Sequence, residues 1–115
     1  MTNKAKKEMY DNHYLKISNL FENVEENKKV IVTGLIEQES FMYVQLKDLN
    51  EIINKKGSVE KFKQGKQEFD RERPATKTYN AMLKNYNLVI KQLIENLPNK
   101  KPLDPDDEFE EFNKI

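Results

Sequence analysis

Apolar residues recur at helical spacing in three stretches of the chain. The clearest stretch runs from Pro74 to Leu97, where apolar side chains return at steps of three and four residues. Proline suits the first position of a helix, because its missing N–H would be unpaired there anyway, and Pro98 cannot continue the helix. We therefore predict one long helix with both ends fixed. Its apolar stripe is wide, and so we expect the helix to be covered on more than one side.

The first of the other two stretches, from about Lys4 to Val24, is typical of one amphipathic helix. Its apolar row consists of Met9, Tyr10, Tyr14, Ile17, Leu20, Phe21 and Val24. A polar segment, EENKK, then separates it from a second helix that extends to Lys56. The buried side of that second helix is predicted at Ile31, Leu35, Gln38, Met42, Leu46, Leu49 and Ile53. Two amphipathic helices joined by a short connection are antiparallel neighbours.

One part of the second helix has an alternative interpretation. The β-branched run from Val30 to Thr33, followed by Gly34, would also fit a short strand. We favour a helix here because the apolar row continues in register for about five further turns.

The pattern changes after Gly57, which we expect to end the second helix. Phe62 and Phe69 flank a polar turn around Gly65, and this arrangement predicts a small β-hairpin. An isolated hairpin is only marginally stable, so we expect its two phenylalanines to contact a helix or a neighbouring subunit.

These elements predict a mainly α-helical chain in four parts. Residues 1–56 form an antiparallel helical hairpin with candidate DNA contacts, and residues 57–73 form a β-hairpin connector. Residues 74–98 form a long core and oligomerisation helix, and residues 99–115 form an acidic, flexible tail. With 115 residues, of which 37% are hydrophobic, one chain builds only a modest core, and we expect burial between subunits to supplement it.

Charge is distributed unevenly although the net charge is zero. From residue 55 to 84 there are nine basic residues against four acidic ones, whereas residues 103–115 hold six acidic residues and one lysine. The two regions therefore favour different partners, although solvated surface is an equally good explanation of either.

The residues that catalysis or metal binding requires are largely absent. The chain has no cysteine, no glycine-rich phosphate loop and a single histidine, His13, which we interpret as a surface or boundary side chain. Glu37 and Glu39 have no histidine near them in the sequence, so a di-metal site finds no support. We predict a binding protein rather than an enzyme, without a cofactor or metal. With no long apolar run and no signal peptide, we expect no membrane partner and a location in the cytoplasm.

Several local motifs follow one another in a recognisable order. ENKK precedes the helix LIEQESFMYVQLKDLNEIINKKG, then V-x-x-x-x-x-G leads into RERPATKTYNAMLKNYNLVIKQLIENLP and the acidic DDEFEEF. In this order, from Glu25 to Phe112, the chain resembles the small subunit of phage terminase, as found in tailed double-stranded-DNA phages. The resemblance implies a ring-forming homo-oligomer in the host cytoplasm that recognises viral double-stranded DNA and recruits the large ATPase and nuclease subunit.

The resemblance also suggests roles for particular residues. The basic residues that would contact DNA are Lys4, Lys6, Lys7, Lys16, Lys61, Lys63, Lys66, Arg71 and Arg73. The residues that would pack against other copies are Tyr79, Met82, Leu83, Tyr86, Val89, Ile90, Leu93 and Leu97. The tail residues that would bind a partner are Asp106, Asp107, Phe109 and Phe112. Because no basic helix-turn-helix is evident, we expect contacts with the DNA backbone rather than with bases. The alternative is a small helical interaction or regulatory module that does not bind DNA.

Overall fold

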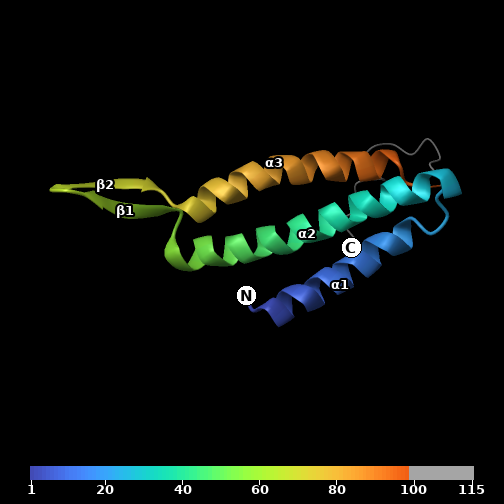
Figure 1. Cartoon of the computed structure of the whole chain (residues 1–115), viewed down its shortest axis with the longest axis horizontal. Coiled ribbons are helices and arrows are strands. Elements are labelled where there is room, and N and C mark those ends of the chain that lie inside the picture. The colour runs from blue at the N-terminus through green and yellow to red at the C-terminus, as the bar shows by residue number, and fades with distance from the viewer. Residues whose placement is uncertain (99–115) are drawn as a thin grey trace.

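Three helices and one β-hairpin form the protein in the computed structural model, which describes residues 1–98 (Figure 1). The elements are α1 (Asn3–Leu20), α2 (Glu26–Lys56), β1 (Val59–Gln64), β2 (Gln67–Glu72) and α3 (Pro74–Glu95). Each helix runs antiparallel to the next, and the hairpin extends beyond the ends of α2 and α3 (Figure 1). The predicted fold class, mainly helical with a two-stranded antiparallel hairpin, is confirmed. The predicted acidic tail and its partner-binding residues lie outside the described residues.

The helix ends follow from local chemistry. The side chain of Thr2 accepts a hydrogen bond from the N–H of Ala5 at 3.1 Å and so caps α1. Gly57 follows α2 with a φ of 86°, a value that favours glycine, and Pro74 is the first residue of α3, as predicted. The residues from Val30 to Thr33 are helical, which resolves the alternative in favour of a helix.

The hydrophobic core lies where α1 meets α2 and α3. It consists of Ile17, Phe21, Val24, Val32, Ile36, Val89 and Leu93, with Tyr14, Leu20, Leu35, Met42 and Leu97 packed around it. The predicted apolar row of α1 is therefore largely correct.

The predicted buried row of α2 is wrong at Ile31 and Gln38, whereas Leu35 and Met42 pack against the core as predicted. Ile31 is 66% exposed and Gln38 is exposed, whereas Val32, Ile36 and Glu39 are buried. The reason is that α2 carries two adjacent rows of apolar side chains, and α1 and α3 together decide which of them is covered. Val32 and Ile36 share the core with Ile17 of α1 and with Val89 and Leu93 of α3. Leu46, further along the predicted row, is buried as predicted.

The β-hairpin has a two-residue loop, Gly65 and Lys66, between the paired Gln64 and Gln67. Gly65 has a φ of 63°, as a tight hairpin turn requires. Phe62 and Phe69 face each other across the strands, with ring centroids 5.4 Å apart. Of the two contacts expected for the hairpin, the one with a helix is not formed within residues 1–98, because the strands point away from the helical body (Figure 1). The contact with a neighbouring subunit stays a prediction.

Candidate functional site

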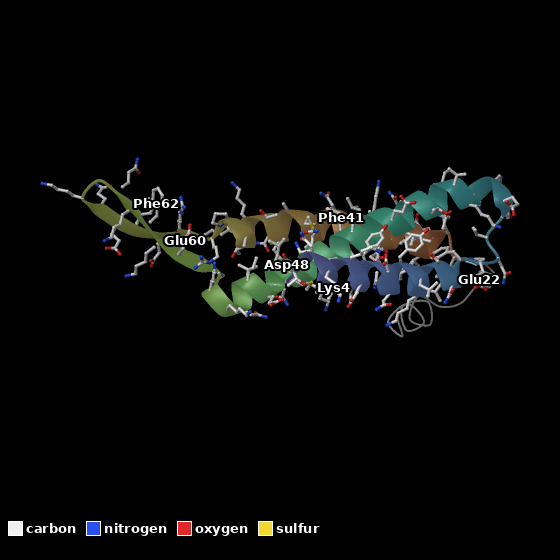
Figure 2. The ribbon with its side chains drawn as sticks, turned by 60° about the horizontal axis from the view of Figure 1, so that its bottom comes forward. Lys4, Glu22, Phe41, Asp48, Glu60 and Phe62 are labelled. Atoms are coloured by element: carbon white, nitrogen blue, oxygen red, sulfur yellow. The ribbon has the colours of Figure 1, made fainter. Side chains whose placement is uncertain are left out.

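Of the four α1 lysines predicted to contact DNA, two form ion pairs with acidic side chains and two do not. Lys6 binds Asp48 of α2 at 3.0 Å, and Lys7 binds Asp11 one turn away at 2.7 Å. Lys4 and Lys16 are exposed and form no ion pair within residues 1–98. In the view of Figure 2, Lys4 lies between the hairpin end, marked by Phe62, and the opposite end, marked by Glu22. Lys4 and Lys16 are therefore the α1 lysines whose charge is available to a phosphate.

The charges of the hairpin are matched across its strands. Lys61 stands opposite Asp70 and Lys63 opposite Glu68 in the strand register, and the Nζ of Lys61 lies 4.0 Å from the carboxylate of Glu68. Opposite charges that face each other across strands stabilise the pairing. Of the predicted basic residues here, Lys63 and the turn residue Lys66 are exposed without an ion pair among the described residues.

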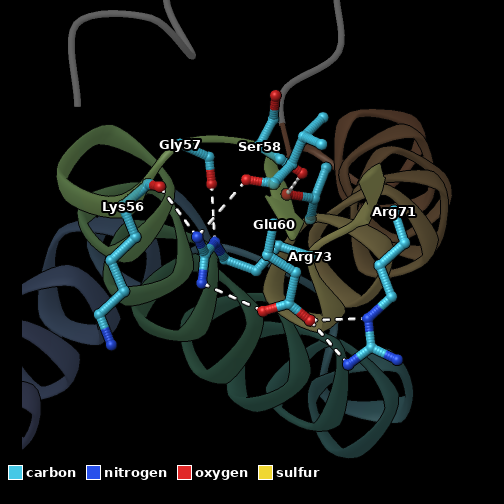
Figure 3. A network of polar contacts seen from close by, with 8 residues as sticks. Lys56, Gly57, Ser58, Glu60, Arg71 and Arg73 are labelled. Atoms are coloured by element: carbon cyan, nitrogen blue, oxygen red, sulfur yellow. Dashed lines mark hydrogen bonds and ion pairs between the residues drawn. The ribbon is translucent and has the colours of Figure 1, made fainter. Parts of the chain in front are cut away.

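Arg73 acts at the base of the hairpin rather than at its surface (Figure 3). Its guanidinium donates to the carbonyl oxygens of Lys56 and Gly57, both at 2.9 Å, and lies 3.4 Å from the carboxylate of Glu60. A positive charge on the last carbonyl groups of α2 is also favoured by the helix dipole. Arg73 therefore joins the end of α2 to the hairpin and is not directed toward an external phosphate.

Arg71 completes the same cluster from β2. It contacts the other oxygen of Glu60 at 2.8 Å and lies 3.9 Å from the centre of the Phe62 ring. At the junction with α3, the hydroxyl of Thr76 donates to the carbonyl of Ser58 at 2.9 Å. These contacts fix the direction of the hairpin relative to α2 and α3.

An open apolar groove runs between α2 and α3. Phe41 is 54% exposed and Leu88 is 59% exposed. They line a cavity of about 360 Å³ together with Met42, Val89 and the uncharged polar residues Gln38, Asn85 and Gln92. A second cavity, of about 480 Å³, shares Met42 and Asn85 with the first and extends to Lys77, Thr78, Ala81 and Met82. We call these residues the α2/α3 groove. Figure 2 shows Phe41 and Lys4 on opposite sides of the helical body.

The residues predicted for oligomerisation are divided between this groove and the interior. Val89 and Leu93 are buried in the core of their own chain, and the Tyr86 hydroxyl points to Glu39. Met82 lines the groove, while Tyr79, Leu83, Ile90 and Leu97 are half-buried. The exposed apolar surface of α3 thus lies at Leu88, one position before the buried Val89, and the predicted row missed it.

A buried polar cluster joins all three helices, and it was not predicted. The side chain of Glu39 on α2 is fully buried. The Nε2 of His13 on α1 lies within hydrogen-bond distance of both carboxylate oxygens, at 2.6 and 2.9 Å. The hydroxyl of Tyr86 on α3 donates to the same carboxylate at 2.8 Å. Burial, and the Glu39 carboxylate beside it, raise the pKa of the Tyr86 phenol. The His13 ring also stacks on Tyr43, with 3.7 Å between centroids.

The sequence did contain a signal for this cluster. His13 is four residues before Ile17 and thus belongs to the buried row of α1, and Glu39 continues the row of Val32 and Ile36. His13, Glu39 and Tyr86 each lie within the buried row of a different helix. Because buried polar groups need hydrogen-bond partners, this position predicts that the three side chains contact one another. No set of three or more His, Cys, Asp or Glu side chains within residues 1–98 is placed to hold a metal ion.

Comparisons with models of protein families, with curated proteins and with solved structures find no match. No helix within residues 1–98 is long and apolar enough to span a membrane. The resemblance to terminase small subunits therefore rests on the order of the sequence motifs.

Proposed function

We propose that the chain is a non-catalytic DNA-binding subunit that works as a homo-oligomer, as the small subunits of phage terminases do. In this role it binds viral double-stranded DNA and recruits the large ATPase and nuclease subunit. The observation that carries the proposal is the α2/α3 groove, an apolar surface that residues 1–98 leave uncovered. Patches of this kind on a soluble protein mark contact surfaces.

A second copy of the chain is the occupant that suits this groove. Apart from Lys77, the groove is lined by apolar and uncharged polar side chains, so an apolar surface can enter it without burying an unpaired charge. Other apolar side chains are exposed elsewhere, namely Leu15 on α1 and Val30 and Ile31 on α2, at 61%, 82% and 66%. A contact between two different surfaces repeats from copy to copy and closes into a ring when the rotation allows.

The proposed DNA contacts are the exposed lysines without an intramolecular partner among the described residues. These are Lys4 and Lys16 on α1 and Lys63 and Lys66 on the hairpin. Lysine binds phosphate as a point charge, which agrees with contacts to the DNA backbone. Recruitment of the large subunit by Asp106, Asp107, Phe109 and Phe112 is proposed from the sequence alone.

Assembly is tested by light scattering coupled to gel filtration at micromolar concentration. We expect the wild-type chain to have the mass of a multimer, and Leu88→Lys to reduce that mass because it places a charge in the α2/α3 groove. Asn87→Lys is the matched control, since it adds the same charge at an exposed neighbouring position. A monomeric wild-type chain, or equal masses for the two variants, would contradict the proposal.

DNA binding is tested by titrating a double-stranded fragment at several salt concentrations. The logarithm of the affinity should fall linearly with the logarithm of the salt concentration, and Lys16→Gln should reduce the slope by about one. Lys7→Gln, whose charge is already paired with Asp11, is the control and should change the slope less.

The hairpin favours a second candidate, an interaction module that does not bind DNA. Its charges are matched across the strands, and Phe69 is 44% exposed next to Phe62. Opposite charges that face each other across the strands, together with an exposed aromatic side chain, suit a protein partner better than a phosphate backbone. An oligomer that fails to bind DNA even at low salt would support this candidate.

A further inference from the structure

The two faces of the β-hairpin differ in chemistry. Successive side chains of a strand point to opposite faces, so the strand register places alternate residue pairs on the same face. One face, which we call the charged face, consists of Val59, Lys61, Lys63, Glu68, Asp70 and Glu72. The other, which we call the aromatic face, consists of Glu60, Phe62, Gln64, Gln67, Phe69 and Arg71.

The aromatic face presents an apolar centre whose charges are paired. Phe69 is 44% exposed, and its ring packs edge-on against Phe62. Arg71 and Glu60 lie 2.8 Å apart, so the two charges of this face compensate each other. Aromatic side chains and arginine are enriched at protein interfaces. The aromatic face therefore has the composition of a protein-binding surface.

No helix within residues 1–98 covers the aromatic face. The hairpin extends beyond α2 and α3 and points away from the helical body (Figure 1). Its base is held in that direction, because the N–H of Arg73 and the hydroxyl of Thr76 both donate to the carbonyl of Ser58 at 2.9 Å. A surface whose position is fixed before contact loses less conformational freedom on binding. The hairpin is thus an arm prepared to contact a second molecule.

The α2/α3 groove matches the aromatic face in chemistry and in width. The exposed Phe41 and Leu88 lie there beside uncharged amide side chains, and Lys77 is its only charged residue. Amide groups both donate and accept hydrogen bonds, so those of Gln64 and Gln67 can pair with the amides of the groove. Neighbouring strands lie about 5 Å apart and packed helices about 8–10 Å apart, so a two-stranded ribbon can lie along a groove between two helices.

The other exposed apolar side chains suit the groove less well. Leu15 is one helical turn from Asp11, and Ile31 is one turn from Lys28, so each shares its side of the helix with an exposed charge. Docking of either side chain would bring that charge against an apolar surface, which is unfavourable. The aromatic face avoids this cost because Glu60 and Arg71 pair with each other.

We propose that the aromatic face of the hairpin of one copy docks into the α2/α3 groove of a second copy, with Phe69 as the central contact. This inference rests on the proposed assembly through the groove and names the surface that enters it. The charged face, which includes Lys63, stays in solvent and remains free to contact phosphate. The contact forms whether or not the chain binds DNA.

The role of the aromatic face is tested by light scattering over a range of protein concentrations. Phe69→Lys places a charge in the contact and should raise the dissociation constant of the assembly about thirtyfold, as expected for a central interface residue. Val59→Lys is the matched control and should leave it unchanged, since Val59 is 50% exposed but lies on the charged face. Gln67→Lys should also weaken the assembly. It retains both phenylalanines, and so it distinguishes a lost contact from an unfolded hairpin.

The outcomes separate this inference from the proposed assembly. If Leu88→Lys lowers the mass while Gln67→Lys leaves the dissociation constant unchanged, the assembly stands and the hairpin is not the occupant of the groove. Equal effects of Phe69→Lys and Val59→Lys would also overturn the docking of the aromatic face. A monomeric wild-type chain would overturn both proposals.

Disulfide formation tests whether the groove is the surface that the hairpin contacts. The chain contains no cysteine, so introduced cysteines are its only thiols. Gln67→Cys combined with Asn85→Cys or with Gln92→Cys should give covalent multimers on mild oxidation, because a disulfide requires Cα atoms within about 7 Å. Glu68→Cys on the charged face, combined with the same groove positions, is the control and should give none. Equal yields from the two series, or no multimer from either Gln67→Cys combination, would overturn the proposal.

Discussion

Two glutamates organise this protein in different environments. Glu39 lies in the middle of the helical body, is fully buried and joins α1, α2 and α3 through His13 and Tyr86. Glu60 lies at the base of the hairpin, is 23% exposed and joins the strands to the end of α2 through Arg71 and Arg73. Both carboxylates hold several elements together. The difference is that water can replace the partners of Glu60 but cannot reach Glu39.

This difference decides what each cluster contributes. Breaking a buried ion pair leaves an uncompensated charge, whereas exposed pairs contribute little because water and salt screen them. The cluster around Glu39 should therefore control the stability of the helical body. The cluster around Glu60 should control the direction of the hairpin, mainly through the carbonyl groups that Arg73 binds.

The largest expected effect follows from removing His13. His13→Ala leaves the Glu39 carboxylate with Tyr86 alone, and we expect the free energy of unfolding at pH 6 to decrease by about 3 kcal/mol. Urea denaturation followed by circular dichroism measures this change. Asn12→Ala, at the exposed neighbouring position, is the control and should change stability by less than about 0.5 kcal/mol. Similar losses for the two variants would mean that the bond from His13 to the buried Glu39 carboxylate contributes little to stability.

The contrast between the clusters also shows what the sequence can predict. Pro74, Gly57 and Gly65 mark ends and turns through their own backbone preferences, and the elements around them were predicted correctly. These signals are local, and so they remain valid whatever packs around them.

Contacts between elements were harder to predict. The pattern of α2 offered two adjacent apolar rows, and the positions of α1 and α3 determine that Val32 is buried while Ile31 and Phe41 stay exposed. For the same reason the α2/α3 groove was missed. Arg73 was predicted to contact DNA because the sequence shows its charge. The sequence does not show that its guanidinium binds backbone carbonyl groups at the end of α2.

A smaller effect is expected at the hairpin, where Arg71 and Arg73 form a matched pair around Glu60. Arg73→Gln loses the bonds to two carbonyl groups as well as the ion pair, and should destabilise the protein by about 2 kcal/mol. Arg71→Gln loses an exposed ion pair and should cost about 0.5 kcal/mol. Arg73→Lys should not restore stability, because an ammonium group cannot reproduce the planar fork of the guanidinium. Thermal unfolding of the three variants provides the comparison, and equal losses for Arg71→Gln and Arg73→Gln would argue against a special role for Arg73.

An effect smaller than those of His13→Ala and Arg73→Gln is expected at Asp48, a carboxylate with 15% side-chain exposure. The hydrogen bond from Lys6 lowers the pKa of Asp48 in the folded protein. An unfolded aspartate has a pKa of about 3.9, so the contribution of the pair is complete above that value and is lost as the pH falls through the lower folded value. Because both side chains are partly exposed, we expect Asp48→Asn to cost at most about 1 kcal/mol at pH 6.

The pH dependence of stability shows whether Asp48 contributes through its ion pair or through packing. Denaturation of wild type and Asp48→Asn between pH 2.5 and 6 should show curves that converge at the acidic end, because the protonated carboxyl no longer differs in charge from the amide. Asp11→Asn is the control, since the pair of Asp11 with Lys7 is exposed to solvent and should contribute less. A difference between wild type and Asp48→Asn that stays constant down to pH 2.5 would mean that Asp48 acts through packing. The exposure of a carboxylate would then not predict its contribution to stability, because Asp48 would contribute through packing whereas Glu39 contributes through its charge.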